Sequence, residues 1–119
     1  MSSLISLSLL LAVFSRVQAD VVLTQPPTLT GEPGQALRLT CKTSGFDLST
    51  SWMDWIRQVP GKGLEWLLSY YNPSNKNYAP GIENRVTVIK EDSKNIFDLI
   101  IKSPRVNDTA IYYCVRGSQ

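Results

Sequence analysis

The sequence contains no histidine, and this absence restricts the chemistry that the chain could perform. Histidine is the commonest general base and the commonest metal ligand at neutral pH. The two cysteines have no further cysteine and no histidine to complete a metal site. The serines fall in loop-like stretches without a base beside them, which disfavours nucleophilic catalysis. We therefore expect a non-enzyme that holds neither a metal nor a cofactor.

Charge is also scarce in this chain. The formal net charge is only +2 over 119 residues. Partners such as nucleic acid or an anionic membrane surface usually require a strongly basic patch or tail. The 43% of hydrophobic residues is sufficient for the core of one small domain. The composition thus predicts one globular domain that does not bind nucleic acid.

Residues 1–19 differ in kind from the rest. Leu4 to Phe14 form an apolar run of 11 residues, and the small residues Val17 and Ala19 precede Asp20. This pattern predicts a signal peptide that is cleaved after Ala19. The alternative, a transmembrane anchor, is disfavoured because a helix of that length spans only about half of the hydrocarbon core. We expect an exported mature chain of residues 20–119 without a membrane segment.

Beyond residue 20 the sequence alternates in short runs, and clusters of turn-forming residues separate these runs. This pattern predicts about eight antiparallel strands in a sandwich or barrel, without an internal domain boundary. The clearest runs are 21–25, 36–43, 53–59, 64–71, 85–90, 96–101 and 109–115, and residues 72–77 read as a polar turn. The run 53–59 carries Ile56 on the face opposite Met53 and Trp55, which indicates a strand covered on both sides.

Cys41 and Cys114 lie 73 positions apart on two of these strands. Because export leads to an oxidising compartment, we expect them to form a disulfide bond. Closing a loop of this length stabilises a fold by about 4 kcal/mol in the chain-entropy description. A reactive thiol is the alternative, but nothing else in the sequence supports it.

Several motifs around these cysteines identify a family. Trp55 follows Cys41 by 14 positions, and Tyr112 stands two positions before Cys114. With SGF, WIRQVPGKGLEWL and DTAIYYC, the chain from residue 20 to residue 119 resembles an immunoglobulin heavy-chain variable domain. VVLTQPP looks less mammalian and favours another vertebrate class. The resemblance implies an all-β, V-type two-sheet Greek-key sandwich, in which Trp55 packs on the disulfide and the Tyr112 hydroxyl bonds to the backbone.

The chain stops five residues after Cys114. In the family a final strand follows this cysteine, and a separate joining segment encodes it. The ending therefore resembles an unrearranged germline variable segment, and we expect the final strand of the sandwich to be missing.

The resemblance also implies roles for individual residues. Arg85 and Asp108 match an ion pair that closes one end of the sandwich. A light-chain variable domain would be contacted by Ile56, Gln58, Gly63, Leu64, Trp66 and Tyr113. Antigen would be contacted by three loops that contain Phe46, Asp47, Ser49, Thr50, Ser51, Trp52, Tyr70, Tyr71, Asn72, Ser74, Asn75, Lys76, Arg116, Gly117 and Ser118. Asp54 would lie on the floor between the antigen loops and the light-chain surface.

One motif remains outside these roles. Asn107-Asp108-Thr109 is an N-glycosylation sequon, and we expect less than half occupancy because Asp108 would be held in a tight turn.

The resemblance makes antigen recognition by a secreted or cell-surface receptor the expected function, as the heavy-chain half of an antibody or B-cell receptor. The alternative is an immunoglobulin-type receptor or adhesion domain of innate or T-cell-receptor type. Such a domain need not keep the light-chain surface. The intact WIRQVPGKGLEWL block favours the antibody interpretation.

Overall fold

The computed structural model describes residues 21–22 and 35–117. The expected signal peptide, residues 23–25 of the first expected strand and Ser118 lie outside this part of the chain. The described part contains eight strands and four short 3-10 segments, and no α-helix. The all-β fold class predicted from the sequence is confirmed.

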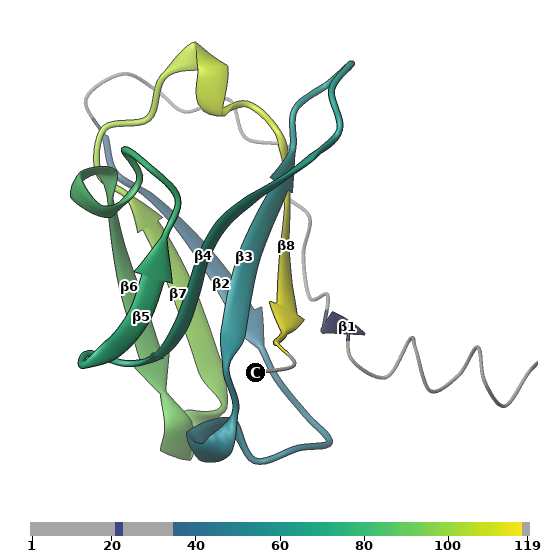
Figure 1. Cartoon of the computed structure of the whole chain (residues 1–119), viewed down its shortest axis with the longest axis vertical. Coiled ribbons are helices and arrows are strands. Elements are labelled where there is room, and N and C mark those ends of the chain that lie inside the picture. The colour runs from purple at the N-terminus through teal and green to yellow at the C-terminus, as the bar shows by residue number, and fades with distance from the viewer. Residues whose placement is uncertain (1–20, 23–34, 118–119) are drawn as a thin grey trace, which may run out of the picture.

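The strands form two antiparallel sheets (Figure 1). The larger sheet has the order β1-β8-β3-β4-β5, and the smaller sheet has the order β2-β7-β6. The strand bounds are β1 Val21–Val22, β2 Leu37–Lys42, β3 Met53–Gln58, β4 Leu64–Asn72, β5 Asn75–Tyr78, β6 Val86–Glu91, β7 Ile96–Ile101 and β8 Ile111–Arg116. Within the described residues β8 is the last strand.

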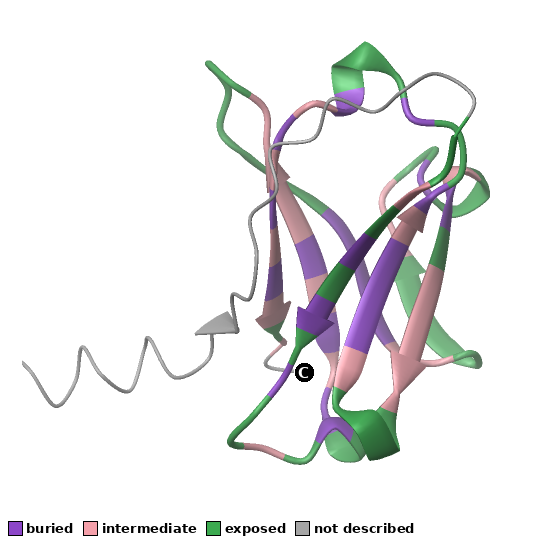
Figure 2. Cartoon of the chain, turned by 180° about the vertical axis from the view of Figure 1, so that it is seen from behind, coloured by how far each residue is buried: buried purple, intermediate pink, exposed green. Residues whose placement is uncertain are grey.

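The core lies between the two sheets, and alternate residues of β2, β3 and β8 enter it, whereas β4 buries four consecutive residues (Figure 2). In β2 and β7 the buried residues include Leu39, Cys41, Phe97 and Leu99, each at most 3% exposed. β7 departs from strict alternation, since Asp98 on its outward parity is also buried and pairs with Arg38 at 2.6 Å. The predicted hydrophobic pattern is therefore correct for the core. The pattern did not predict that Asp98, on the outer face of β7, would also be buried.

The disulfide between Cys41 and Cys114 joins the two sheets, as predicted. Their Cα atoms lie 6.4 Å apart, within the range of native disulfides. Trp55 is the neighbour of Cys114 across the β3–β8 ladder, and its ring stacks on Phe97 with centroids 5.7 Å apart. The Tyr112 hydroxyl donates a hydrogen bond of 2.6 Å to the carbonyl oxygen of Asp108.

One expectation about secondary structure is wrong. Residues 72–77 were expected to form a polar turn, but the turn is limited to two residues and Asn75–Tyr78 form β5 at the edge of the larger sheet. An edge strand needs only backbone pairing with one neighbour, so its polar side chains carry no period that would reveal it.

The described residues contain no helix long and apolar enough to cross a membrane. They also contain no group of three or more acidic or cysteine side chains that could hold a metal ion.

Candidate binding surfaces

Three segments that are distant in the sequence meet at one end of the sandwich, at the foot of Figure 1. They are the loop that contains the 3-10 segment η1, Leu48–Thr50, the turn between β4 and β5, and the end of β8. The exposed side chains here are mostly polar, and half-buried aromatic rings lie between them. Rigid aromatic rings beside small polar groups are typical of surfaces that recognise other molecules.

Asp47 fixes the first of these segments. Its Oδ1 accepts hydrogen bonds from the Ser49 N–H at 3.0 Å and from the Ser49 hydroxyl at 2.6 Å. These bonds lower the pKa of Asp47 below its ordinary value, with the Ser49 hydroxyl as the largest cause. The Ser51 hydroxyl donates to the Asp47 carbonyl oxygen at 2.7 Å. The loop is thus ordered by its own short-range hydrogen bonds.

Lys90 connects the first segment to the second. Its Nζ donates to the carbonyl oxygens of Ser51 at 2.9 Å and Tyr71 at 2.8 Å, and it lies 4.7 Å from the centroid of the Tyr71 ring. Only 4% of the side chain is exposed. Burial lowers the pKa of Lys90, and the carboxylate of Asp92 at 3.7 Å opposes that shift. A buried cation therefore holds the two loops together.

Two aromatic contacts extend this arrangement. The rings of Trp52 and Tyr71 lie 5.5 Å apart, and both residues are half-buried. At the end of β8, the Arg116 guanidinium lies 4.8 Å from the centroid of the Phe46 ring. The Asn72 carboxamide oxygen shapes the β4–β5 turn, since it accepts from the Ser74 N–H at 3.0 Å.

The structure corrects two of the predicted loop residues. Tyr70 is 8% exposed and packs with Phe97 at a centroid distance of 6.4 Å, so it belongs to the core. Ser51 is 4% exposed, and its polar atoms face Asp47 and Lys90. The other predicted loop residues within the described part of the chain are exposed or half-buried, and they are Phe46, Asp47, Ser49, Thr50, Trp52, Tyr71, Asn72, Ser74, Asn75, Lys76, Arg116 and Gly117.

Asp54 lies beneath the end of β8. A Cβ atom placed on Gly117 would stand 3.1 Å from Asp54 Oδ1, and the Gly117 N–H donates to the Trp52 carbonyl oxygen at 2.7 Å. Asp54 Oδ1 is buried and has no hydrogen-bond partner among the described residues. Burial raises the pKa of Asp54, while Ser69 and Trp66 beside it act in the opposite direction.

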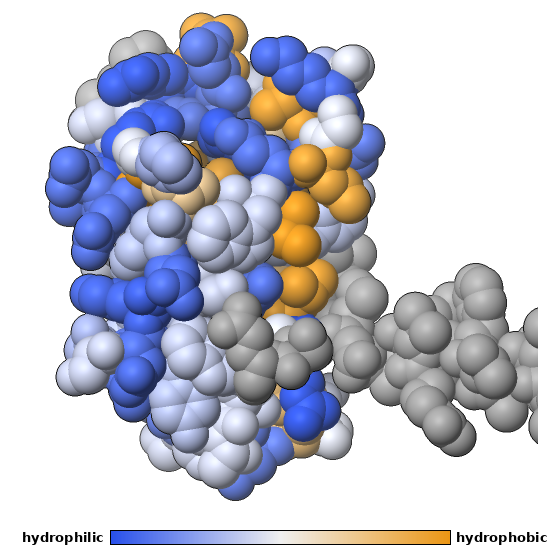
Figure 3. Space-filling view, in the orientation of Figure 1, coloured by the Kyte–Doolittle hydropathy of each residue, from blue (hydrophilic) through white to orange (hydrophobic). Residues whose placement is uncertain are grey.

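A second surface lies on the outer face of the larger sheet. Leu64 is 67% exposed and Trp66 is 39% exposed, both unusually high for large hydrophobic side chains. Figure 3 shows hydrophobic side chains gathered along the β3 and β8 side of this face. A shallow groove of about 350 Å³ there is lined by Ile56, Gln58, Leu64, Tyr113 and Val115. We name this surface, together with Trp66 and Gly63, the pairing face, because exposed apolar patches typically mark contact sites.

The opposite end of the sandwich is closed by an ion-pair cluster. The Asp108 carboxylate accepts from Arg85 Nη2 at 2.6 Å, Arg57 Nη1 at 3.0 Å and the Arg105 N–H at 2.8 Å. Burial alone would raise the pKa of Asp108, but these hydrogen bonds, with Arg85 foremost, hold that pKa below its ordinary value. The cluster is structural, since it lies far from the three loops.

Sequence reasoning missed three residues of these sites. Lys90 and Arg57 each donate hydrogen bonds to two different segments of the chain, and no local sequence pattern predicts such contacts. Val115 shares the parity of Ile111 and Tyr113 on the same strand, and this parity could have placed it on the pairing face.

Comparison with known proteins agrees with this geometry. The model of the immunoglobulin V-set domain matches residues 24–119. The chain is 48% identical over 99 residues to the IgW heavy chain V region W26 of Heterodontus francisci, and the match covers 83% of this chain and 82% of that protein. The chain therefore belongs to the immunoglobulin V-set family, as a heavy-chain variable domain of a non-mammalian kind.

Proposed function

We propose that this domain binds antigen through its three-loop end while its pairing face holds a light-chain variable domain. The observation that carries the proposal is the meeting of three distant segments at one end, beside an exposed apolar face. The function is recognition without chemistry. The IgW relative also supports a location outside the cell, either secreted or on the cell surface as part of a B-cell receptor.

The antigen-binding part of the proposal rests on how firmly hydrogen bonds fix the loops. Lys90 and Asp47 fix the backbone of the first two segments, so their exposed side chains can meet a partner with little further loss of entropy. Trp52 and Tyr71 provide apolar area, and Asn75 and Lys76 provide exposed polar groups at the rim. This combination fits protein antigens, whose surfaces mix apolar and polar groups.

The pairing part rests on exposure. A domain that is stable alone rarely leaves a leucine and a tryptophan open on one sheet face. The pairing face carries no charged side chain among Ile56, Gln58, Gly63, Leu64, Trp66, Tyr113 and Val115. An uncharged apolar centre with a polar rim is the composition of protein–protein interfaces that bury their core.

The pairing experiment uses two exposed hydrophobic residues on different surfaces. The domain is co-expressed with a light-chain variable domain, and complex formation is measured by size exclusion and titration. Leu64→Asp should abolish or strongly weaken the complex, whereas Val106→Asp, at a site 83% exposed in the 3-10 segment η4 and outside the lining of the groove, should leave it unchanged. Equal affinity of both variants would overturn the light-chain assignment.

The antigen experiment uses a display library in which varied sequences and a final strand follow residue 119. Binders are selected on a protein antigen, and alanine is then placed at Trp52, Asp47 or Lys76. These changes should weaken binding, with Trp52 costing the most because buried aromatic anchors dominate such interfaces. Alanine at Glu83 or Lys102, which lie away from the three loops, is the control. Binding that ignores all three loop changes would contradict the proposal.

A further inference from the structure

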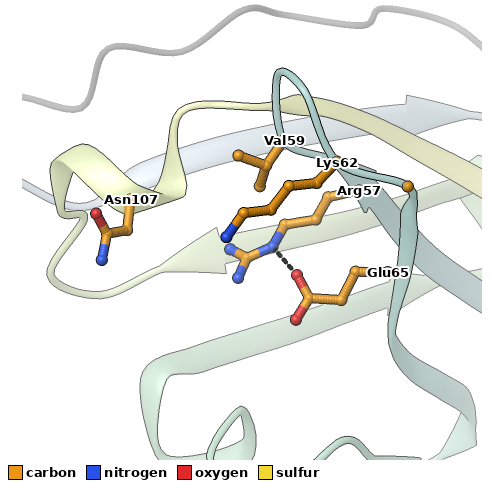
Figure 4. Close-up of a pocket in the computed structure, with 6 residues that line it drawn as sticks. Arg57, Val59, Lys62, Glu65 and Asn107 are labelled. Carbon is orange, nitrogen blue, oxygen red and sulfur yellow. Dashed lines mark hydrogen bonds and ion pairs between the residues drawn. The ribbon is translucent and has the colours of Figure 1, made fainter.

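A cleft of about 410 Å³ lies at the end of the sandwich opposite the three loops, between the β3–β4 turn and the short segment η4, Val106–Asp108. Its lining comes from Arg57, Val59, Lys62, Gly63, Glu65 and Asn107. In Figure 4 the Lys62 side chain extends along Arg57, and Asn107 stands on the facing side of the cleft. The volume lies within the range of pockets that hold small organic ligands.

Asn107 is the first residue of the sequon that the proposed function leaves unused. It is exposed, and its carboxamide makes no hydrogen bond to the described residues. The expectation of low occupancy rested on the tight turn at Asp108. In the structure the turn buries the middle residue, Asp108, and leaves the acceptor amide of Asn107 free.

The surroundings of Asn107 suit a sugar. Val59 offers an apolar wall, while Lys62 and Glu65 offer a donor and an acceptor. Val106, beside Asn107, is 83% exposed, which is a hydrophobic surface left open to water. A sugar with an N-acetyl group presents both apolar and hydrogen-bonding surface, so it can cover such a region.

We propose that Asn107 carries an N-linked glycan, and that its first N-acetylglucosamine residue lies in this cleft. The donor is a lipid diphosphate-linked oligosaccharide. The bond between Asn107 Nδ2 and C1 of the sugar forms, the bond between C1 and the diphosphate oxygen breaks, one Nδ2 proton passes to a base of the transferase, and the lipid diphosphate leaves. The inference goes beyond antigen binding and does not depend on it.

Attachment precedes folding. In the folded domain the neighbour of Asn107 is clamped, because Asp108 is 2% exposed, bonds to Arg85, and accepts from Tyr112 through its carbonyl oxygen. A transferase that needs an extended sequon therefore meets it only in the chain that is still entering the secretory pathway. Once the domain has folded, the same contacts fix the backbone next to Asn107, so that the first sugar can lie in the cleft, at the end opposite the three loops.

The attachment test does not require a folded product. The full chain is translated with microsomes, both as it stands and with an efficient secretory leader placed before Asp20, and import is read from protection against added protease. An imported chain should show a mobility shift that peptide N-glycosidase F removes. Asn107→Gln and Thr109→Ala should abolish the shift, whereas Thr109→Ser, which keeps the sequon, and Asn72→Gln should retain it. An imported wild-type chain without the shift overturns the proposal.

The position of the glycan is tested in the folded, secreted domain, with folding checked by near-ultraviolet circular dichroism. The rate of Lys62 acetylation by an amine-reactive reagent is compared before and after enzymatic removal of the glycan. We expect Lys62 to react several-fold more slowly while the glycan is present, and Lys94, at the other end of the sandwich with 68% of its side chain exposed, to react at the same rate in both forms. Equal rates for Lys62 in a glycosylated domain overturn its placement in the cleft.

Discussion

The ammonium group of Lys90 donates a 2.8 Å hydrogen bond to the carbonyl oxygen of Tyr71 and lies 4.7 Å from the centroid of that residue's ring. One side chain thus fixes both the backbone and the ring of a predicted antigen-loop residue. Its second bond, to the Ser51 carbonyl oxygen, brings the first loop into the same contact. The shape of the three-loop end therefore depends on a strand residue that faces inward.

We expect Lys90→Met to lower the free energy of unfolding by about 1–3 kcal/mol, because two partly buried carbonyl oxygens lose their donor. Chemical denaturation measures the loss. Lys94→Met is the control, since the Lys94 side chain is 68% exposed and pairs with Glu91 three positions earlier in the chain. Hydrogen exchange should also rise around Ser51 and Tyr71 in the Lys90 variant alone. Equal stability of the two variants would show that Lys90 does not hold the loops.

The Asp108 cluster sets an acid limit on stability. The ordinary pKa of an aspartate is 3.8, and that of Asp108 in the folded state is lower. The unfolded chain consequently binds more protons in this region of pH. The contribution of Asp108 is complete above about pH 4 to 5 and disappears as the pH falls through the folded-state pKa.

Asp108→Asn should therefore cost about 3–5 kcal/mol at neutral pH, because Arg57 and Arg85 lose a buried carboxylate. Glu65→Gln is the matched control, since Glu65 also pairs with Arg57 but half of its side chain is exposed, and it should cost less than about 1 kcal/mol. Denaturation as a function of pH checks both the cost and the acid limb. In the Asp108 variant the free energy of unfolding should fall less steeply as the pH is lowered into the acid range. An unchanged pH dependence would show that other groups cause acid unfolding.

Asp54 gives a prediction of the opposite sign. Its folded-state pKa is raised by burial, so the folded state binds protons more tightly than the unfolded chain. Ionisation of Asp54 therefore opposes folding at neutral pH. This penalty shrinks as the pH falls below the folded-state pKa and is gone below the ordinary value of 3.8. Asp54→Asn should stabilise the domain at neutral pH, within the roughly 0.5–2 kcal/mol of a favourable single change.

Thermal melts at neutral and acidic pH measure this gain, which should shrink toward acidic pH. Asp47→Asn is the comparison variant. The Asp47 carboxylate accepts two favourable hydrogen bonds from Ser49, so neutralising it should lower the stability of the domain. A pH-independent gain for the Asp54 variant would attribute the effect to shape rather than charge.

The sequence was sufficient to predict the core and the disulfide, because the alternation of apolar residues along a strand and the spacing of the cysteines reflect which side chains are buried. Leu39 and Cys41 on one strand and Phe97 and Leu99 on another face the core as their parity requires. β5 was missed because Asn75–Tyr78 are held by backbone pairing at an edge, where side chains leave no pattern. Tyr70 was misassigned because β4 is buried on both faces from Leu67 to Tyr70, so its place in the predicted run 64–71 did not show that its ring is buried.

The contacts of Lys90 and Arg57 could not be read from the sequence for a different reason. In RVTVIK, a lysine at the strand's end reads as solvent-facing, yet the register places Lys90 opposite the buried Phe97. Its acceptors are 39 and 19 positions away. Arg57 similarly reaches Asp108 across 51 positions. Such partners are determined by the assembled sheets rather than by any local pattern.

Two adjacent tyrosines offer a comparison within one strand. Tyr112 is fully buried, and its hydroxyl donates to the Asp108 carbonyl oxygen, whereas Tyr113 points to the pairing face and is half-buried. Removing the Tyr112 hydroxyl leaves a buried carbonyl oxygen without its donor, which costs about 1–3 kcal/mol.

We therefore expect Tyr112→Phe to lower the free energy of unfolding by that amount, and Tyr113→Phe to change it by less than about 0.5 kcal/mol. For the affinity of a light-chain domain we expect the opposite order. Tyr113→Phe should weaken binding more than Tyr112→Phe, because the Tyr113 hydroxyl would lie at the interface and the Tyr112 hydroxyl would remain remote from it. Denaturation of the single domain and titration of the complex separate the two roles. A Tyr112 variant as stable as the wild type would show that the corner hydrogen bond does not contribute to the fold.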